Sequence, residues 1–154
     1  MVFEKAYPVV LKVQALPHFQ GDMPAYQTPG ASGFDVRAQL EGDLVMAPGE
    51  RALVPTGLSF EVPSGYELQA RPRSGWAIKE GVSLVNSPGT IDADYRGEVK
   101  IILINLGNQP VTIRPQDRIA QLVLCPVLQA RLEWSKDLSA TERGAGGFGS
   151  TELR

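Results

Sequence analysis

Residues 99–127 have the sequence VKIILINLGNQPVTIRPQDRIAQLVLCPV, which contains three apolar runs separated by short turns. The turns carry glycine, proline, asparagine and aspartate, which favour chain reversal, and β-branched residues are frequent in the runs. We therefore predict strands over residues 99–106, 111–113 and 119–127. The first and last runs are too apolar for strands with one solvated face, so we expect burial on both faces. In a chain of only 154 residues, another subunit could cover the second face.

Turn-forming residues interrupt the rest of the chain in the same way. The whole sequence has 16 glycines and 12 prolines, which shorten every element. Further runs predict strands over residues 9–13, 51–55, 58–62, 66–70 and 82–85. Residues 74–80, SGWAIKE, predict the one short helix, with Ser74 as its N-cap and Gly81 as its end. The length suits one domain. The pattern predicts an all-β domain, closed as a barrel or packed as a sandwich.

The last residues, 139–154, have the sequence SATERGAGGFGSTELR, which has too few apolar side chains to build a core. We therefore divide the chain into a β-domain over 1–138 and a flexible glycine-rich arm over 139–154. A frayed tail is one interpretation of the arm. The other is a closing flap, because an arginine, an aromatic ring and hydroxyl groups among glycines can bind phosphate and stack on a base.

The composition excludes several classes of protein. A formal net charge of -2 provides no broad basic surface, so a nucleic-acid polymer is not an expected partner. No segment approaches the roughly 18 apolar residues of a membrane span, and we predict a soluble, cytoplasmic protein. The single cysteine, Cys125, excludes a disulfide within the chain, and its apolar neighbours predict a buried thiol. The single histidine, His18, lies in a polar stretch and is predicted on the surface.

Five short segments combine residues that a core does not require: ASGFDVRA (31–38), RPRSGWA (71–77), NSPGTIDADYRGE (86–98), DRIAQL (117–122) and RGAGGFGST (143–151). Arginine and serine before a helix suit a phosphate group, although a plain surface cap has the same residues. Asp92 could take a proton from water, or it could belong to an ordinary polar hairpin. Asp35 is either a turn residue or a ligand for a hard cation.

In order and spacing, these segments closely resemble the five motifs of the homotrimeric deoxyuridine triphosphatases, over residues 31–151. The resemblance implies an all-β, jelly-roll-like or β-clip subunit with one short helix and a flexible C-terminal arm. It implies a trimer in which three chains build each active site. The implied activity is magnesium-dependent hydrolysis of dUTP to dUMP and pyrophosphate by water attack at the α-phosphorus. Such an enzyme keeps uracil out of DNA and supplies dUMP for dTMP synthesis.

The resemblance also implies a role for each matching residue. Asp92 corresponds to the general base, Asp35 to the acid that holds Mg²⁺ through water, and Tyr95 to the ring under the deoxyribose. The remaining matches correspond to substrate contacts: Arg73, Ser74, Gly75, Gln121 and Arg143 at the phosphates, Asn86, Gly89, Thr90, Ile91 and Phe148 at uracil, and Gly149, Ser150 and Thr151 as further contacts of the arm.

Two departures and three alternatives accompany the resemblance. Trp76 stands where the family usually has leucine or methionine, and the chain continues to Arg154 where many relatives end in glycine. The nearest alternative is a deoxycytidine triphosphate deaminase, which typically has RSS in the second motif and lacks the tyrosine of the third. The others are a nucleotide-binding regulatory relative without catalysis, against which the intact Asp92 argues, and a purely structural β-module, which leaves the arm unexplained.

Overall fold

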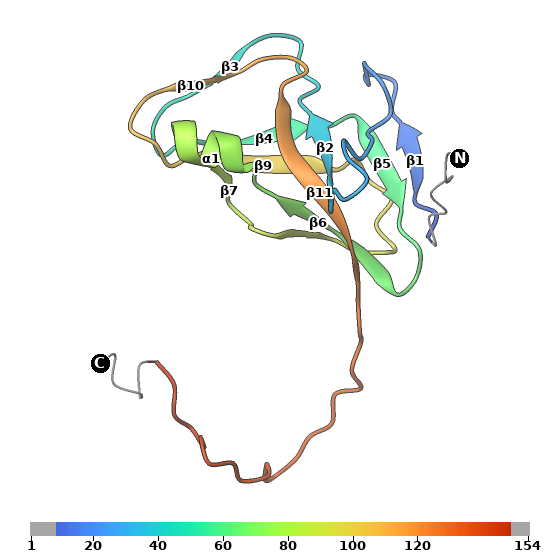
Figure 1. Ribbon diagram of the computed structural model, residues 1–154, viewed down its shortest axis with the longest axis vertical. Coiled ribbons are helices and arrows are strands. Elements are labelled where there is room, and N and C mark those ends of the chain that lie inside the picture. The colour runs from blue at the N-terminus through green and yellow to red at the C-terminus, as the bar shows by residue number, and fades with distance from the viewer. Residues whose placement is uncertain (1–8, 149–154) are drawn as a thin grey trace.

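The computed structural model describes residues 9–148, and Figure 1 shows the path of the chain. Its elements, in order, are β1 (Lys12–Ala15), β2 (Phe34–Arg37), β3 (Leu44–Met46), β4 (Arg51–Pro55), β5 (Leu58–Glu61), β6 (Tyr66–Arg71), α1 (Ser74–Glu80), β7 (Val82–Leu84), β8 (Gly89–Ile91), β9 (Lys100–Asn105), β10 (Val111–Ile113) and β11 (Arg118–Pro126). Short strands and a single helix among the described residues confirm the predicted all-β, jelly-roll-like fold.

The strands form four antiparallel sheets, and most neighbours in a sheet lie far apart in the sequence. The largest sheet has the order β2-β11-β6-β8, and a second has the order β4-β9-β7. The pairs β1-β5 and β10-β3 complete the body. Alternate side chains of these strands enter one core, in which Leu68, Ile101, Leu103 and Leu122 are fully buried. The core therefore holds together both large sheets, on which the candidate functional residues lie.

The predicted strands over 51–55 and 111–113 match β4 and β10, and the six others differ at one or both ends. The first strand begins at Lys12 rather than residue 9. The strands β2, β3 and β8 were not among the predicted strands, because three or four residues are too few to show an alternating pattern.

The helix α1 spans Ser74–Glu80 as predicted, but its N-cap is Arg73 and not Ser74. The cap residue must be extended while its carbonyl accepts the first helical bond. Arg73 meets both conditions, with φ -95° and ψ 125° and its carbonyl 3.0 Å from the Ala77 nitrogen. Gly81 ends the helix as expected, in the left-handed region at φ 71°.

Burial on both faces, predicted for the two long apolar strands, is found within the single chain for β11, where the adjacent Leu122 and Val123 are both buried, but not for β9. In β9, Ile101 and Leu103 are buried, whereas Ile102 and Ile104 on the other face are only half-buried. Leu53 of β4, paired in register with Ile102, is 59% exposed. Cys125 is likewise half-buried rather than buried, since it lies near the end of β11, 3.7 Å from Arg71 Nη2.

The chain leaves the body after β11, where the Val127 amide donates to the Gly65 carbonyl. From residue 128 to residue 145 every residue is exposed, and this segment extends away from the sheets (Figure 1). The exposed segment thus begins before residue 139, and it includes the fully exposed Trp134. Among residues 9–148, no helix is long and apolar enough to span a membrane.

Candidate functional site

The first cluster of candidate residues lies where β2, β11 and β6 meet. Gln121 of β11 is paired in register with Asp35 on one side and with Arg71 on the other. The Asp35 carboxylate accepts hydrogen bonds from Arg73 Nε at 3.1 Å and from Arg118 Nη1 at 3.3 Å. Gln121 Nε2 donates to the Pro72 carbonyl at 3.0 Å, which ties this strand to the segment before the helix. The fold thus brings together Asp35, Arg73 and Gln121, three residues to which the resemblance assigns a role.

This cluster is suited to binding a polyphosphate. The side chain of Arg73 also donates to the Arg118 carbonyl, and a guanidinium group has five donors in all. Ser74 and Gly75 follow directly and are exposed at the start of α1, where backbone N–H groups have no helical acceptor. Arg118 was not predicted as a site residue. Its place in the fourth segment, at the start of the strand that pairs with Asp35, was the available signal.

Asp35 suits a magnesium ion that keeps most of its water. Within residues 9–148 no three His, Cys, Asp or Glu side chains are grouped so that they could hold a metal. The Asp35 side chain is 20% exposed, so one carboxylate can still reach a hydrated ion. Because Mg²⁺ is commonly held by one or two carboxylates together with waters and substrate phosphates, the residues present fit that mode.

The second cluster lies on β8 and the turn that follows it. β8 is the last strand of its sheet in the described part of the chain and pairs with β6 alone. Its other backbone edge can therefore pair with a planar base that carries donors and acceptors. The edge is crowded near Gly89, where a Cβ would lie 3.0 Å from Asn86 Nδ2. Asn86, Gly89, Thr90 and Ile91, which the resemblance assigns to uracil, thus lie together at β8.

Asp92 follows β8 directly and is exposed, and Tyr95 stands at the other end of the same turn. The Tyr95 amide donates to the Asp92 carbonyl at 3.2 Å. Both side chains line a cleft of about 460 Å³, together with Thr90 of β8. The cleft is also lined by Leu53 and Ile102, from the apolar outer face of the second sheet. If a nucleotide base paired with the free edge of β8, the Tyr95 ring could contact its sugar and the Asp92 carboxylate could lie near its α-phosphate.

The two clusters do not form one pocket within this chain. Asp35 lies on β2 and the hairpin begins on β8, and these strands are the opposite ends of the same sheet. The free edge of β8 faces away from β6, and therefore away from β2. The arm residues lie apart from both clusters. Arg143 Nε donates to the Gly146 carbonyl at 2.8 Å, within the arm itself, and the Phe148 ring is exposed. Gly149, Ser150 and Thr151 lie outside the described residues.

Comparison with known proteins decides the family. The dUTPase family model matches residues 20–152, which is most of the chain. The chain belongs to the dUTPase family. Among the relatives of this dUTPase chain, one named deoxyuridine 5'-triphosphate nucleotidohydrolase, from Bdellovibrio bacteriovorus, is 68% identical and covers 93% of this chain and 96% of its own.

Solved structures of dUTPases have the same fold as this family member. A Staphylococcus bacteriophage 80alpha dUTPase with dUPNHPP matches with a TM-score of 0.83 at 25% identity, covering 94% of this chain and 99% of its own. A dUTPase from phage phi11 of S. aureus, described with a structural Mg(II) ion, matches with a TM-score of 0.76 at 22% identity, covering 86% of this chain and all of its own. At that identity the second likeness shows the fold alone.

Proposed function

We propose that the protein hydrolyses dUTP to dUMP and pyrophosphate, with Asp92 as the general base for a water that attacks the α-phosphorus. The observation that carries the proposal is the position of Asp92, exposed at the end of the free β8 edge and in one cleft with Tyr95. Uracil paired with that edge would extend its sugar toward Tyr95 and its α-phosphate toward Asp92. The name of the Bdellovibrio relative describes the same reaction class.

The charge of the triphosphate is offset by cations from separate parts of the chain. Arg73 and Arg118 at the first cluster carry N–H groups that can turn from Asp35 to phosphate oxygens. Ser74, Gly75 and Gln121 add neutral donors, and Arg143 supplies a further charge from the arm. A hydrated Mg²⁺ held by Asp35 would neutralise the charge that develops on the leaving pyrophosphate. Asp92 would orient the attacking water and take its proton.

The point of attack can be tested with isotopically labelled water. Hydrolysis in H₂¹⁸O should place ¹⁸O in dUMP and leave pyrophosphate unlabelled, because the attacking oxygen stays on the phosphorus that it attacks. Mass spectrometry of both products gives the answer directly. Label in pyrophosphate would mean attack at the β-phosphorus, and the assignment of Asp92 to the α-phosphate would then be wrong.

The protein is proposed to act as a homotrimer, in which each site combines the two clusters from different chains. The apolar outer face of β4-β9-β7 is exposed in one chain, and it forms a wall of the Asp92 cleft through Leu53 and Ile102. A neighbouring chain that covered this face would bring its own residues beside Asp92. Shared sites would also explain why Asp35 and Asp92 lie at opposite ends of one sheet.

The trimer predicts a particle mass of three times the chain mass of 16.7 kDa. Light scattering at micromolar concentration should report that mass. Ile102→Asp should dissociate the particle, since a charge would be buried in the proposed interface without a partner. Val45→Asp, at an exposed position of β3 in the separate β10-β3 sheet, is the matched control. An unmodified protein that is monomeric at micromolar concentration would remove the basis for shared sites.

Tyr95 is proposed to reject ribonucleotides, because a ring packed on the deoxyribose leaves no space for a 2′-hydroxyl. Tyr95→Ala should therefore reduce the preference for dUTP over UTP, by roughly 10-fold or more. The measurement is the ratio of kcat/KM for the two nucleotides. An unchanged ratio would mean that another residue excludes the ribose.

A further inference from the structure

The ring of Tyr95 is held against the backbone that follows it. A Cβ placed on Gly97 would lie 2.6 Å from the Tyr95 Cζ atom and 3.0 Å from its Cε2 atom. No side chain other than hydrogen fits there without displacing the ring. The Tyr95 hydroxyl donates to the Glu98 carbonyl at 3.0 Å. The orientation of the ring therefore depends on where the backbone of residues 97 and 98 lies.

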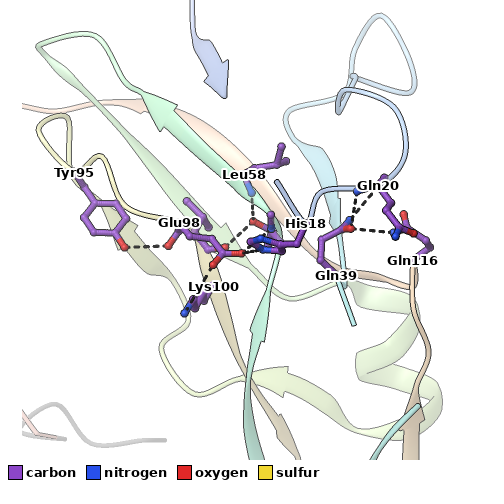
Figure 2. A network of polar contacts seen from close by, with 11 residues as sticks. His18, Gln20, Gln39, Leu58, Tyr95, Glu98, Lys100 and Gln116 are labelled. Carbon is purple, nitrogen blue, oxygen red and sulfur yellow. Dashed lines mark hydrogen bonds and ion pairs between the residues drawn. The ribbon is translucent and has the colours of Figure 1, made fainter. Parts of the chain in front are cut away.

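The side chain of Glu98 fixes that backbone to three other parts of the molecule, as Figure 2 shows. Its Oε1 atom accepts from the Gly57 amide at 2.9 Å and contacts His18 Nε2 at 2.8 Å. Its Oε2 atom lies 3.8 Å from Lys100 Nζ. The carboxylate is only 14% exposed, and a group so largely removed from water is stabilised by such partners.

His18 is the most distant part of this network in the sequence. It precedes Glu98 by 80 residues and lies in the segment after β1, outside the five segments that resemble the family motifs. The side chain contacts Glu98 and lines neither the Asp92 cleft nor the cleft beside Asp35. Its contact with Glu98 therefore restrains the end of the hairpin and does not reach a bound nucleotide directly.

We propose that His18, Glu98 and Gly97 are positioning residues for the Tyr95 ring, so that discrimination between deoxyribose and ribose depends in part on His18, a residue that does not line the substrate cleft. The inference rests on the proposed role of Tyr95. Gly97 leaves the space in which the ring lies, the Glu98 carbonyl holds its hydroxyl, and the His18 contact holds the Glu98 side chain.

The test is a double-mutant comparison that uses sugar discrimination as its readout. Gly97→Ala and His18→Ala are each made in the unmodified chain and in a Tyr95→Ala chain. Discrimination is measured as the ratio of kcat/KM for dUTP and UTP, and in parallel as the ratio of affinities for non-hydrolysable analogues of both. A loss of folded protein lowers both members of a ratio equally, so a merely structural role would not change it.

In the unmodified chain, Gly97→Ala should lower the ratio by roughly 10-fold, because ångström-scale misplacement of a site group has effects of up to about 10²-fold. His18→Ala should lower the ratio by about 3-fold, which corresponds to the net free energy of one hydrogen bond. In the Tyr95→Ala chain neither change should have an effect, since no ring remains to be positioned. Lys12→Ala, which removes an exposed ion pair with Glu61, is the control and should leave the ratio unchanged.

Three results would overturn the proposal. Ratios that stay normal after Gly97→Ala and His18→Ala would show that the network does not position the ring. If Gly97→Ala and His18→Ala lower the ratio as much in the Tyr95→Ala chain as in the unmodified chain, the network acts through a group other than the Tyr95 ring. If Tyr95→Ala alone leaves the ratio unchanged, the sugar-selecting role of Tyr95 fails and the positioning role fails with it. The analogue affinities separate these outcomes from a failure of the catalytic proposal, because they need no turnover.

Discussion

Asp92→Asn is expected to lower the turnover of dUTP by about 10² to 10⁴-fold, the usual contribution of a general base. Asparagine keeps the size and shape of the side chain, and it cannot take a proton from water. Binding should survive the change. A negative charge close to a triphosphate opposes ground-state binding, so affinity for a non-hydrolysable dUTP analogue should be equal or slightly higher.

Asp94→Asn is the matched control for this change, because Asp94 is an exposed acid in the same turn and does not line the cleft that Asp92 shares with Tyr95. It should leave turnover near normal. Single-turnover kinetics and analogue titration on both variants make the comparison. Near-normal turnover by Asp92→Asn would show that a different group activates the water.

Truncation of the chain after Ser139 is expected to abolish both turnover and tight binding of the analogue. The truncation removes Arg143 and Phe148, which the structure leaves exposed and separate from the two clusters. If these residues close over a neighbouring site, their loss removes a cation that binds phosphate and a ring that stacks on uracil. It also lets water enter the site. The variant keeps Asp92, so its loss of affinity distinguishes it from Asp92→Asn.

Single substitutions on the arm separate these contributions. Arg143→Ala and Phe148→Ala should each weaken analogue binding, whereas Lys136→Ala should not, although it also removes an exposed cation from the same extended segment. Isothermal titration with the analogue measures all three. A truncated protein that works as well as the intact one would show that the arm is a tail without a role in the reaction.

Much of the fold could be predicted from local patterns in the sequence. The runs at 51–55 and 111–113 gave strands with the observed bounds because turn-forming residues border them on both sides. The helix end was predicted from Gly81, which needs a positive φ. The N-cap of the helix was misplaced by one residue, since both Arg73 and Ser74 are compatible with a turn before a helix and only backbone geometry separates them.

Two-sided burial within one chain is found for β11 but not for β9, and the reason for the difference is physical. An apolar run such as VKIILINL indicates how much surface must be removed from water, but not which chain covers it. In the structure the inner face of β9 packs in the core and Ile102 remains half-exposed beside Leu53. Whether a second chain covers that face stays a prediction.

Residue types and spacing indicated the members of the candidate site, but not their arrangement. The family motifs pointed to Asp35, Gln121 and Arg73. The register of β2 with β11 places Asp35 beside Gln121, and Arg73 joins them through its hydrogen bond to Asp35. The bond from Arg118 to Asp35 joins residues 83 positions apart, and that from His18 to Glu98 joins residues 80 apart. No local pattern encodes such pairs, because sheet pairing between distant strands creates them.

Pyrophosphate release from dUTP, UTP, dTTP and dCTP, each measured with and without magnesium, tests the proposed activity. We expect rapid release from dUTP with one dUMP per pyrophosphate, a strong preference over the other three nucleotides, and a large loss of rate when magnesium is removed. Ammonia released from dCTP without pyrophosphate would identify a deaminase instead, and tight binding of dUTP without turnover would contradict the assignment of Asp92 as a general base.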